Sequence, residues 1–413
     1  MAKRRVVVTG LGALTPVGND VPTMWSNLLA GKSGAGPITQ FDASNFKTKF
    51  ACEVKGFDPI AIVGKKDARR MDRFTQFAVA VAKQALDDSG LPVNADTAPR
   101  IGVMIGTGIG GIATLTAQIE EMMVKGPDRI SPFTVPMMLP DTAAGQVAIQ
   151  FGLKGPNLCP VSACATGSNA IGEAAEWVRR GIADAVLAGG AEAAILPVSV
   201  ASFNNMTAIS TRNDAPDKAC RPFDKDRDGF VVGEGAGVLV LEDLDHALAR
   251  NAHIYAEVIG YGLSADAYHI TAPDETGAGA AMAMQMALDQ AGLQPHQIDY
   301  INAHGTSTPL NDKSETAAIK RVFGEVAYQV PISSTKSMTG HLLGAAGAIE
   351  GVVAVKVIGE GLIPPTINYE TPDPNCDLDY VPNALRRKQV NTVMSNSFGF
   401  GGHNAVVIFS RYQ

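Results

Sequence analysis

Residues Val161-Ser-Ala-Cys-Ala-Thr-Gly-Ser-Asn-Ala-Ile171 set a cysteine among small residues, where an extended segment turns into a helix. The extended segment ends over residues 158–162, and apolar residues then recur at the i, i+3, i+4 and i+7 spacing of one helix face. These apolar residues are Ile171, Ala174, Ala175 and Val178. We expect the helix to end at Arg179-Arg-Gly181, because cations suit the negative pole of a helix and glycine can adopt a left-handed cap.

The position of Cys164 at a helix N-terminus predicts a reactive thiol. Unpaired backbone N–H groups and the positive end of the helix dipole both favour a thiolate. We therefore expect the pKa of Cys164 to move from its usual value of about 8.5 toward neutrality, which would make the sulfur a usable nucleophile. The alternative interpretation is a buried structural cysteine, since free cysteine is among the most buried residue types.

A second loop of the same kind carries His304. A short apolar run over residues 298–303 ends abruptly at His304-Gly-Thr-Ser-Thr-Pro309, and Asn311 or Asp312 can cap the helix that follows. His304 is thus expected at the carboxyl end of a strand, on a loop rich in glycine and hydroxyl groups.

A third loop carries His341. Residues 330–333 lead into Ser334-Thr-Lys-Ser-Met-Thr-Gly-His341, and a strongly apolar helix is expected from residue 342 to about 358. Functional loops of open α/β sheets lie at the carboxyl ends of strands. We therefore expect Cys164, His304 and His341 to converge on one site.

Glu350 is the unusual residue of that apolar helix. A buried carboxylate costs several kcal/mol unless it is paired, and Lys336, just before the helix, is the nearby candidate partner. The alternative is a glutamate at a locally exposed edge.

A glycine loop lies near the C-terminus, in Met394-Ser-Asn-Ser-Phe-Gly-Phe-Gly-Gly-His-Asn404. Its glycines let the backbone approach a ligand and point N–H groups inward, as an oxyanion hole requires. The alternative is an ordinary glycine-rich hairpin turn.

Composition fits an enzyme without a nucleic-acid or membrane partner. The chain has 413 residues and a net charge of −7, which argues against general nucleic-acid binding. No apolar run approaches the ~18 residues of a membrane span. A strand is expected from residue 5, leaving no space for a signal peptide. The five cysteines are scattered and show neither a disulfide framework nor a metal-ligand spacing, so a cytoplasmic location is expected.

Strands and helices alternate throughout, which indicates an α/β fold with a largely parallel sheet. Several strands run into glycine turns, but none has the Walker lysine or a complete dinucleotide fingerprint, so nucleotide binding is rejected. Residues 1–250 and 251–413 open similarly, with an apolar strand, glycines and a polar turn, which suggests a duplication. The cysteine falls in the first half and both histidines in the second, so the site is expected between the halves.

Together these motifs resemble the β-ketoacyl-(acyl-carrier-protein) synthases of the thiolase superfamily, and most closely the bacterial synthases II that elongate fatty acids. The resemblance covers essentially the whole length and includes Arg221-Pro-Phe-Asp-Lys-Asp-Arg-Asp-Gly-Phe230. It implies a five-layered α-β-α-β-α fold of two similar halves with mixed, largely parallel sheets, and a homodimer. It also implies an acyltransferase that performs a decarboxylative Claisen condensation. No cofactor is implied, because phosphopantetheine is carried by the acyl carrier protein.

The resemblance assigns roles to particular residues. Cys164, His304, His341 and Lys336 would be catalytic, and the backbone N–H groups of Cys164 and Phe400 would form the oxyanion hole. Thr271, Thr306 and Thr308 would bind the phosphopantetheine arm, while the Phe400 ring and Ile109 would gate and limit the acyl pocket. Asp312, Glu315 and Glu350 would support the site. A structural monovalent cation would be held by Asn302, Glu350, Ser395 and Asn404.

Because the carrier is acidic, its docking surface should be basic. The cluster Lys65, Lys66, Arg69 and Arg70, with Arg129 and Arg212, is the predicted surface, and a solvated helix face is the alternative. His403 and Asp141 depart from the residues usual in the family.

Three functions stay open: a condensing enzyme of fatty-acid synthesis, a ketosynthase of a polyketide or other specialised chain, and a non-condensing partner subunit. The presence of Cys164 with both histidines argues against the third.

Overall fold

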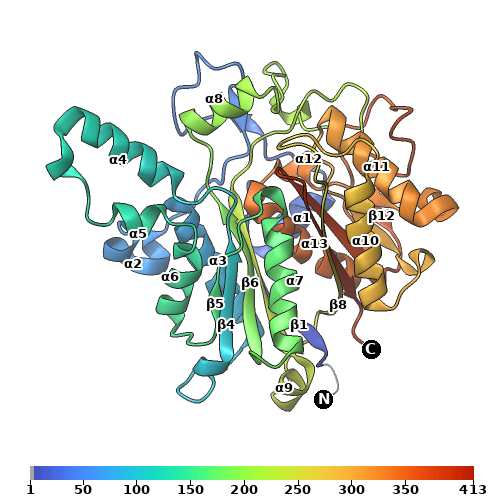
Figure 1. Cartoon of the computed structure of the whole chain (residues 1–413), viewed down its shortest axis with the longest axis horizontal. Helices are drawn as coiled ribbons and strands as arrows, with labels where there is room; N and C mark the ends of the chain where they lie inside the picture. The colour runs from blue at the N-terminus through green and yellow to red at the C-terminus, as the bar shows by residue number, and fades with distance from the viewer. Residues whose placement is uncertain (1–3) are drawn as a thin grey trace.

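The computed structural model describes residues 4–413, and ten strands of this part of the chain form one sheet (Figure 1). They are β1 (Val6–Leu14), β4 (Ile101–Gly106), β5 (Asn157–Leu158), β6 (Ala185–Glu192), β7 (Gly235–Asp243), β8 (Ala256–Ala265), β9 (Tyr300–Asn302), β10 (Ile332–Ser333), β13 (Thr392–Gly399) and β14 (His403–Ser410). Two small sheets pair β2 (Gly36–Pro37) with β3 (Phe50–Ala51), and β11 (Leu362–Ile363) with β12 (Arg386–Arg387).

The large sheet repeats one strand order on either side of a seam. From the seam outward the order is β1-β7-β6-β4-β5 on one side and β8-β14-β13-β9-β10 on the other. Each side therefore places its first strand at the seam, followed by its fifth, fourth, second and third. The seam is the antiparallel pair β1–β8, in which Val7 faces Glu257 and Val8 faces Ala256. The predicted construction from two similar halves is confirmed.

The sheet is mixed, as predicted, with parallel pairings toward both edges. These are β5–β4, β4–β6, β13–β9 and β9–β10. The pairings between β6 and β13 across the middle are antiparallel, a larger share than the alternation of strands and helices indicated. One reason is that β13 and β14 are joined by residues 400–402 alone, too few for the crossover that a parallel pair needs.

Helices complete the five layers. The first half-sheet is covered on its outer face by α3 (Arg73–Ser89) and α6 (Thr142–Phe151), and the second by α10 (Ala278–Ala291) and α11 (Pro309–Phe323). Between the half-sheets lie α7 (Thr166–Arg179) and α13 (Ala346–Glu360), which contact strands of both (Figure 1). The remaining helices are α1 (Val21–Leu29), α2 (Ile60–Ala68), α4 (Ile112–Lys125), α5 (Thr134–Met138), α8 (Pro197–Asn205), α9 (Leu244–Ala249) and α12 (Lys336–Thr339).

The two central helices cross closely because each places a glycine at the contact. A Cβ on Gly167 would lie 2.5 Å from the Ala348 nitrogen, and one on Gly347 would lie 2.4 Å from Ser168 Oγ. The predicted apolar face of α7 is buried here, and Gly181 adopts the expected left-handed conformation after the helix. Almost all of α13 is buried, which explains its apolar sequence.

Each central helix is preceded by a tight 3-10 turn of the same shape. Ala163–Ala165 precedes α7, and Leu343–Ala345 precedes α13. Ala163 and Leu343 both have left-handed backbones, with φ of 50° and 49°. Cys164 therefore sits in a strained turn just before the helix, not in its first turn.

The N-terminal cap of α11 differs from the one that the sequence predicts. The α11 helix is capped by Thr308, whose side chain accepts from the Asn311 backbone N–H; neither Asn311 nor Asp312 is the cap. This follows because Pro309 occupies the first helical turn, which places the cap one residue before it. In residues 4–413, no helix has both the length and the apolar character that a bilayer crossing demands.

Candidate active site

A pocket of about 570 Å³ opens at the turns that precede the two central helices. Cys164, His304 and His341 all line it, so the structure brings together the three residues that the sequence placed on separate loops. The two imidazole rings lie edge to face, with their centroids 5.4 Å apart. All three side chains are buried, with Cys164 only 7% exposed.

The glycine loop closes over the cysteine. Gly399, at the end of β13, packs so tightly that a Cβ there would lie 2.7 Å from the Ser162 carbonyl oxygen and 3.1 Å from the Cys164 nitrogen. The Phe400 backbone N–H, next along the loop, acts to lower the pKa of the thiol. The glycine loop therefore lies directly against the turn that carries Cys164.

The prediction that Cys164 has a pKa near neutrality is wrong. Burial raises the pKa of this thiol to about 12, while Lys336 and the Phe400 N–H act in the opposite direction. The helix-terminus argument considered only the favourable dipole and omitted the cost of moving a thiolate out of water, which is the larger effect here.

Both histidines are neutral in this setting. Burial lowers the pKa of His304 and of His341 well below the usual range, and the charge of Lys336 lowers both further. His304 follows β9 directly, and its loop is fixed by Glu315, whose two oxygens accept from the His304 and Gly305 backbone N–H groups at 2.8 and 2.7 Å. A neutral imidazole carries one N–H that can donate to a substrate oxygen.

Lys336 and Glu350 form a buried ion pair. The Lys336 ammonium donates to Glu350 Oε1, and the two residues are 1% and 2% exposed. The alternative that Glu350 lies at an exposed edge is therefore wrong. Glu350 Oε2 has no protein partner in the described part of the chain.

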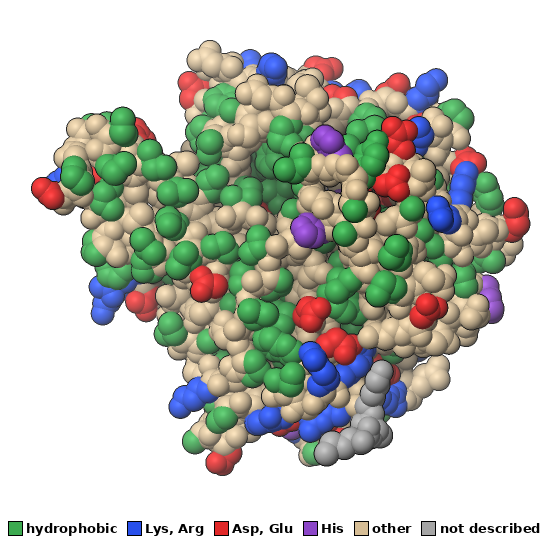
Figure 2. All heavy atoms as spheres, viewed as in Figure 1, with side chains coloured by type: hydrophobic (Ala, Val, Ile, Leu, Met, Phe, Trp, Pro, Cys, Tyr) green, Lys and Arg blue, Asp and Glu red, His purple; other side chains and the backbone are tan. Residues whose placement is uncertain are grey.

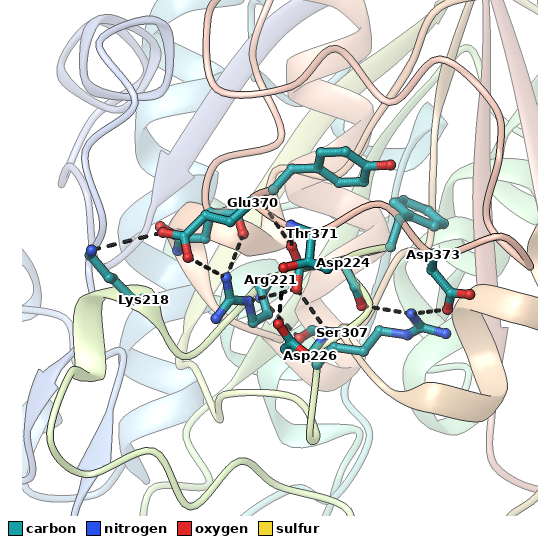
Figure 3. A network of polar contacts seen from close by, with 12 residues as sticks. Lys218, Arg221, Asp224, Asp226, Ser307, Glu370, Thr371 and Asp373 are labelled. Carbon is teal, nitrogen blue, oxygen red and sulfur yellow. Dashed lines mark hydrogen bonds and ion pairs between the residues drawn. The ribbon is translucent and has the colours of Figure 1, made fainter.

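A second set of ion pairs braces the loop after His304 (Figure 3). The Arg221 backbone N–H donates to Ser307 Oγ at 2.9 Å, while its guanidinium contacts Asp224 and donates to Glu370. The buried carboxylate of Asp312 accepts from the Phe223 N–H at 2.8 Å. The sequence motif around Arg221 forms part of the family resemblance, but residue spacing alone does not predict its contact with the histidine loop.

The predicted substrate-binding residues all line the pocket, namely Ile109, Thr271, Thr306, Thr308 and Phe400. The Thr306 and Thr308 hydroxyls lie 3.1 Å apart at one wall. The predicted docking residues line no part of the pocket: Lys65, Lys66, Arg69, Arg70 and Arg129 are exposed, and Arg212 is half-buried. His403 and Asp141 are exposed and also lie outside its lining.

Three of the four residues predicted to hold a cation fit that role. Asn302 and Ser395 are register neighbours on β9 and β13, and their side chains are buried with polar atoms that lack partners. Glu350 lies on α13, which packs against β13. Asn404 does not fit, because its amide donates to Asp266 at 2.7 Å and it lines the pocket. It pairs with Phe398, one hairpin turn beyond Ser395.

The neutral state of His341 predicts a pH-dependent stability. Its pKa in the unfolded chain is about 6.5, whereas in the folded chain burial holds it well below. Below pH 6.5 the unfolded chain binds the extra proton, so stability falls by about 1.4 kcal/mol per pH unit for this group. His341→Gln should remove that slope, measured by urea unfolding at pH 5 to 7.

The stability of the wild type also depends on Glu315, which changes it with pH in the opposite direction. The contribution of His341 is therefore measured as the difference in stability between the two proteins at each pH. Burial raises the pKa of Glu315 from 4.5 to about 7, so its contribution to stability is present below pH 4.5 and is lost as the pH rises through about 7. Equal slopes in the wild type and His341→Gln would contradict a neutral His341.

A sheet of two similar halves around two central helices, with a cysteine and two histidines in one pocket, defines the thiolase-like class of condensing enzymes. The chain belongs to the β-ketoacyl synthase family: the N-terminal domain of that family matches residues 3–247 and the C-terminal domain matches residues 255–370.

Comparison with full-length relatives indicates which type of β-ketoacyl synthase the chain is similar to. The chain is 55% identical to a 3-oxoacyl-[acyl-carrier-protein] synthase 2 of Synechocystis sp. and 53% identical to one of Coxiella burnetii, covering 100% of this chain and 99% of each relative. Among solved structures, a type II polyketide ketosynthase bound to its acyl-carrier protein superposes with a TM-score of 0.92 at 38% identity, covering 100% of both chains.

Proposed function

We propose that this protein is a 3-oxoacyl-(acyl-carrier-protein) synthase of type 2, which elongates fatty acyl chains by two carbons. The observation that carries the proposal is the meeting of Cys164, His304 and His341 in one buried pocket. The full-length relatives at 53–55% identity bear the name of this activity. Its chemistry is acyl transfer to a thiol followed by a decarboxylative Claisen condensation.

In the first half-reaction, the Cys164 sulfur attacks the thioester carbonyl of an acyl carrier. The C–S bond to the carrier breaks, the carrier sulfur takes up the proton that the Cys164 thiol releases and leaves as a thiol, and an acyl-enzyme remains. The N–H groups of Cys164 and Phe400 stabilise the oxyanion that forms at the carbonyl. Loss of one such donor typically costs about 3–4 kcal/mol.

In the second half-reaction, a malonyl carrier enters, and His304 and His341 donate N–H bonds to its thioester oxygen. The C–C bond to the carboxylate breaks and carbon dioxide leaves. The electron pair of that bond forms an enolate, whose oxygen accepts the two N–H bonds. The enolate carbon attacks the acyl carbonyl, the bond to Cys164 breaks, and the released thiolate takes up a proton from solvent. The leaving carboxylate supplies the carbanion, so this scheme requires no metal or organic cofactor.

A specialised polyketide-type ketosynthase is the second candidate. The fold and the pocket suit both, since the polyketide ketosynthase has the same fold. Identity favours fatty-acid elongation, at 55% to the Synechocystis synthase against 38% to the polyketide enzyme. A non-condensing partner subunit is disfavoured by the complete set of Cys164, His304 and His341.

We further propose that an acyl carrier protein docks on the basic residues near α2, with Arg129 and Arg212 contributing. Lys65, Lys66, Arg69 and Arg70 are exposed there, and a carrier is acidic. A similar ketosynthase has been solved in complex with its acyl-carrier protein, which supports an acyl carrier protein as the partner here. Phosphopantetheine would arrive on the carrier, between Thr271, Thr306 and Thr308.

We also propose a cation site, a division into two halves and a cellular location. Asn302, Ser395 and Glu350 would hold a monovalent cation whose charge neutralises the second oxygen of Glu350. The chain would divide near residue 250, into a nucleophile half (1–250) and a histidine half (251–413). A cytoplasmic location is consistent with five free cysteines.

We also propose a homodimer through the α4–β5 side of the molecule. The α4 helix buries none of its residues, although Met123 and Val124 are apolar and 78% and 73% exposed. In Figure 1 the α4 helix extends away from the body of the molecule, and Figure 2 shows hydrophobic side chains gathered over this part. In the same half of the molecule, the edge strand β5 leaves one side unpaired, with Leu158 53% exposed. A second copy offers the same edge and the same apolar face, which suits a two-fold interface.

Leu158→Glu is therefore expected to convert the dimer to monomers, because it places a charge on the edge strand at the centre of the interface. Sedimentation velocity at micromolar concentration measures the outcome. Met286→Glu on α10 is the matched control, since Met286 is 45% exposed on the opposite half. Dimers that persist in Leu158→Glu would argue against this interface.

The activity itself is tested by supplying the wild-type enzyme with malonyl carrier and a ladder of straight-chain acyl carriers. Elongation of medium and long chains, detected by mass spectrometry of the carrier, is the expected result. Elongation confined to branched or polyketide primers would favour the second candidate. Absence of elongation with every primer would overturn the proposal.

A further inference from the structure

Glu192, at the end of β6, is a fully buried carboxylate that the reaction scheme above does not use. It accepts four hydrogen bonds, none from a charged group in the described part of the chain. Oε1 accepts from Thr107 Oγ1 at 2.9 Å and from the Ile109 N–H at 3.3 Å. Oε2 accepts from the Gly108 N–H at 2.7 Å and from the Gly344 N–H at 3.0 Å.

These donors belong to two different turns that both line the pocket. One turn follows β4 and carries Ile109; the other follows His341 and carries Leu343. The two turns meet so closely that a Cβ on Gly344 would lie 2.2 Å from the Gly108 nitrogen. A Cβ on Gly108 would lie 2.7 Å from Glu192 Oε2. Glycine at both positions lets a single carboxylate bind both turns.

The other half of the fold uses the same device. Glu315 accepts from the His304 and Gly305 N–H groups after β9, the second strand of its half. Glu192 accepts from the Gly108 and Ile109 N–H groups after β4, the second strand of the first half. In each half, a buried carboxylate thus fixes the loop after the second strand. Glu192 also accepts a hydrogen bond from the Gly344 N–H, which belongs to the other half.

We propose that Glu192 is a positioning residue that holds the Ile109 turn against the turn after His341 and so sets the shape of the acyl end of the pocket. This inference rests on the proposed function, since it concerns acyl chains delivered to Cys164. Ile109 and Leu343 pack with Cys164 in one apolar cluster, so a shift of either turn changes the space beside the acyl-thioester.

The charge of Glu192 provides a readout that a purely structural role would not change. Among the groups that face Cys164, Glu192 and Glu350 raise the pKa of the thiol, whereas Lys336 and the Phe400 N–H lower it. His304 and His341 are neutral. Removing the negative charge at Glu192 should therefore make the thiolate easier to form.

The test uses Glu192→Gln, Glu192→Asp and Thr107→Val beside the wild-type protein. Gln removes the charge and replaces one acceptor by a donor, so the preference between medium and long acyl carriers should shrink by about tenfold. Acyl-enzyme formation followed by intact mass measures this preference. Alkylation of Cys164 by iodoacetamide at pH 7.5 should be faster in Glu192→Gln and unchanged in Glu192→Asp.

Glu242→Gln is the control, because Glu242 is equally buried on β7 but bonds Thr9 and Arg250 away from the pocket. Should Glu192→Gln fail to fold, Thr107→Val removes one donor while keeping the charge, and it should still reduce the chain-length preference. An unchanged preference in the folded variants, or unchanged alkylation in Glu192→Gln, would overturn the inference. Wild-type protein that forms no acyl-enzyme would instead overturn the proposed function, while alkylation would still test Glu192.

Discussion

Cys164→Ala is expected to abolish acyl-enzyme formation and to reduce condensation by roughly a thousandfold or more, because among the described residues Cys164 supplies the one thiol that lines the pocket. The backbone N–H groups that form the oxyanion hole stay in place in this variant. The wild type incubated with acyl carrier should gain the mass of one acyl group per chain, and the variant should gain none.

Cys376→Ala is the matched control for this experiment. Cys376 is also buried, and burial also raises its thiol pKa to about 12, but it packs with Phe223 and Tyr380 outside the pocket. This variant should lose some stability and keep its acylation. Normal elongation by Cys164→Ala would exclude this sulfur as the nucleophile.

Lys336→Met is expected to lower the free energy of unfolding by about 3–5 kcal/mol, because it leaves the buried carboxylate of Glu350 without its counter-charge. It should also reduce decarboxylation of malonyl carrier, since Lys336 helps to keep both histidines neutral. Chemical denaturation and carbon dioxide release measure the two effects separately.

The double variant Lys336→Met/Glu350→Gln distinguishes the two roles of the lysine. Replacing both charges removes the unpaired carboxylate, so most of the lost stability should return. Decarboxylation should stay low if the positive charge acts on the site. Recovery of both stability and decarboxylation would show that Lys336 serves only as the partner of Glu350.

Much of this arrangement could be predicted from sequence because its parts are local. The apolar spacing after Cys164 marks α7, the glycines mark the loop at Gly399, and the carboxylate within the apolar helix indicates a buried partner. Repeated strand–loop–helix units place Cys164, His304 and His341 at the carboxyl ends of strands. The five-layered fold itself followed from the resemblance to a family, not from these patterns.

What sequence could not supply are effects that depend on distance and burial. The pKa of Cys164 was misjudged because a helix terminus is visible in sequence, whereas the depth of the thiol is not. Asn404 was grouped with Asn302 although a hairpin turn directs it to the pocket. The role of Glu192 has no signal in the sequence, since its four donors come from positions as far apart as Thr107 and Gly344.

The raised thiol pKa of Cys164 has a consequence for the lifetime of the protein. Peroxides attack thiolates and convert them stepwise to sulfenic and then to irreversible sulfinic and sulfonic acids. A sulfur that stays protonated and 7% exposed between turnovers presents little thiolate to such oxidants. The burial that makes this residue harder to ionise therefore also spares it from damage, so inactivation by hydrogen peroxide should be slow for a thiol-dependent enzyme.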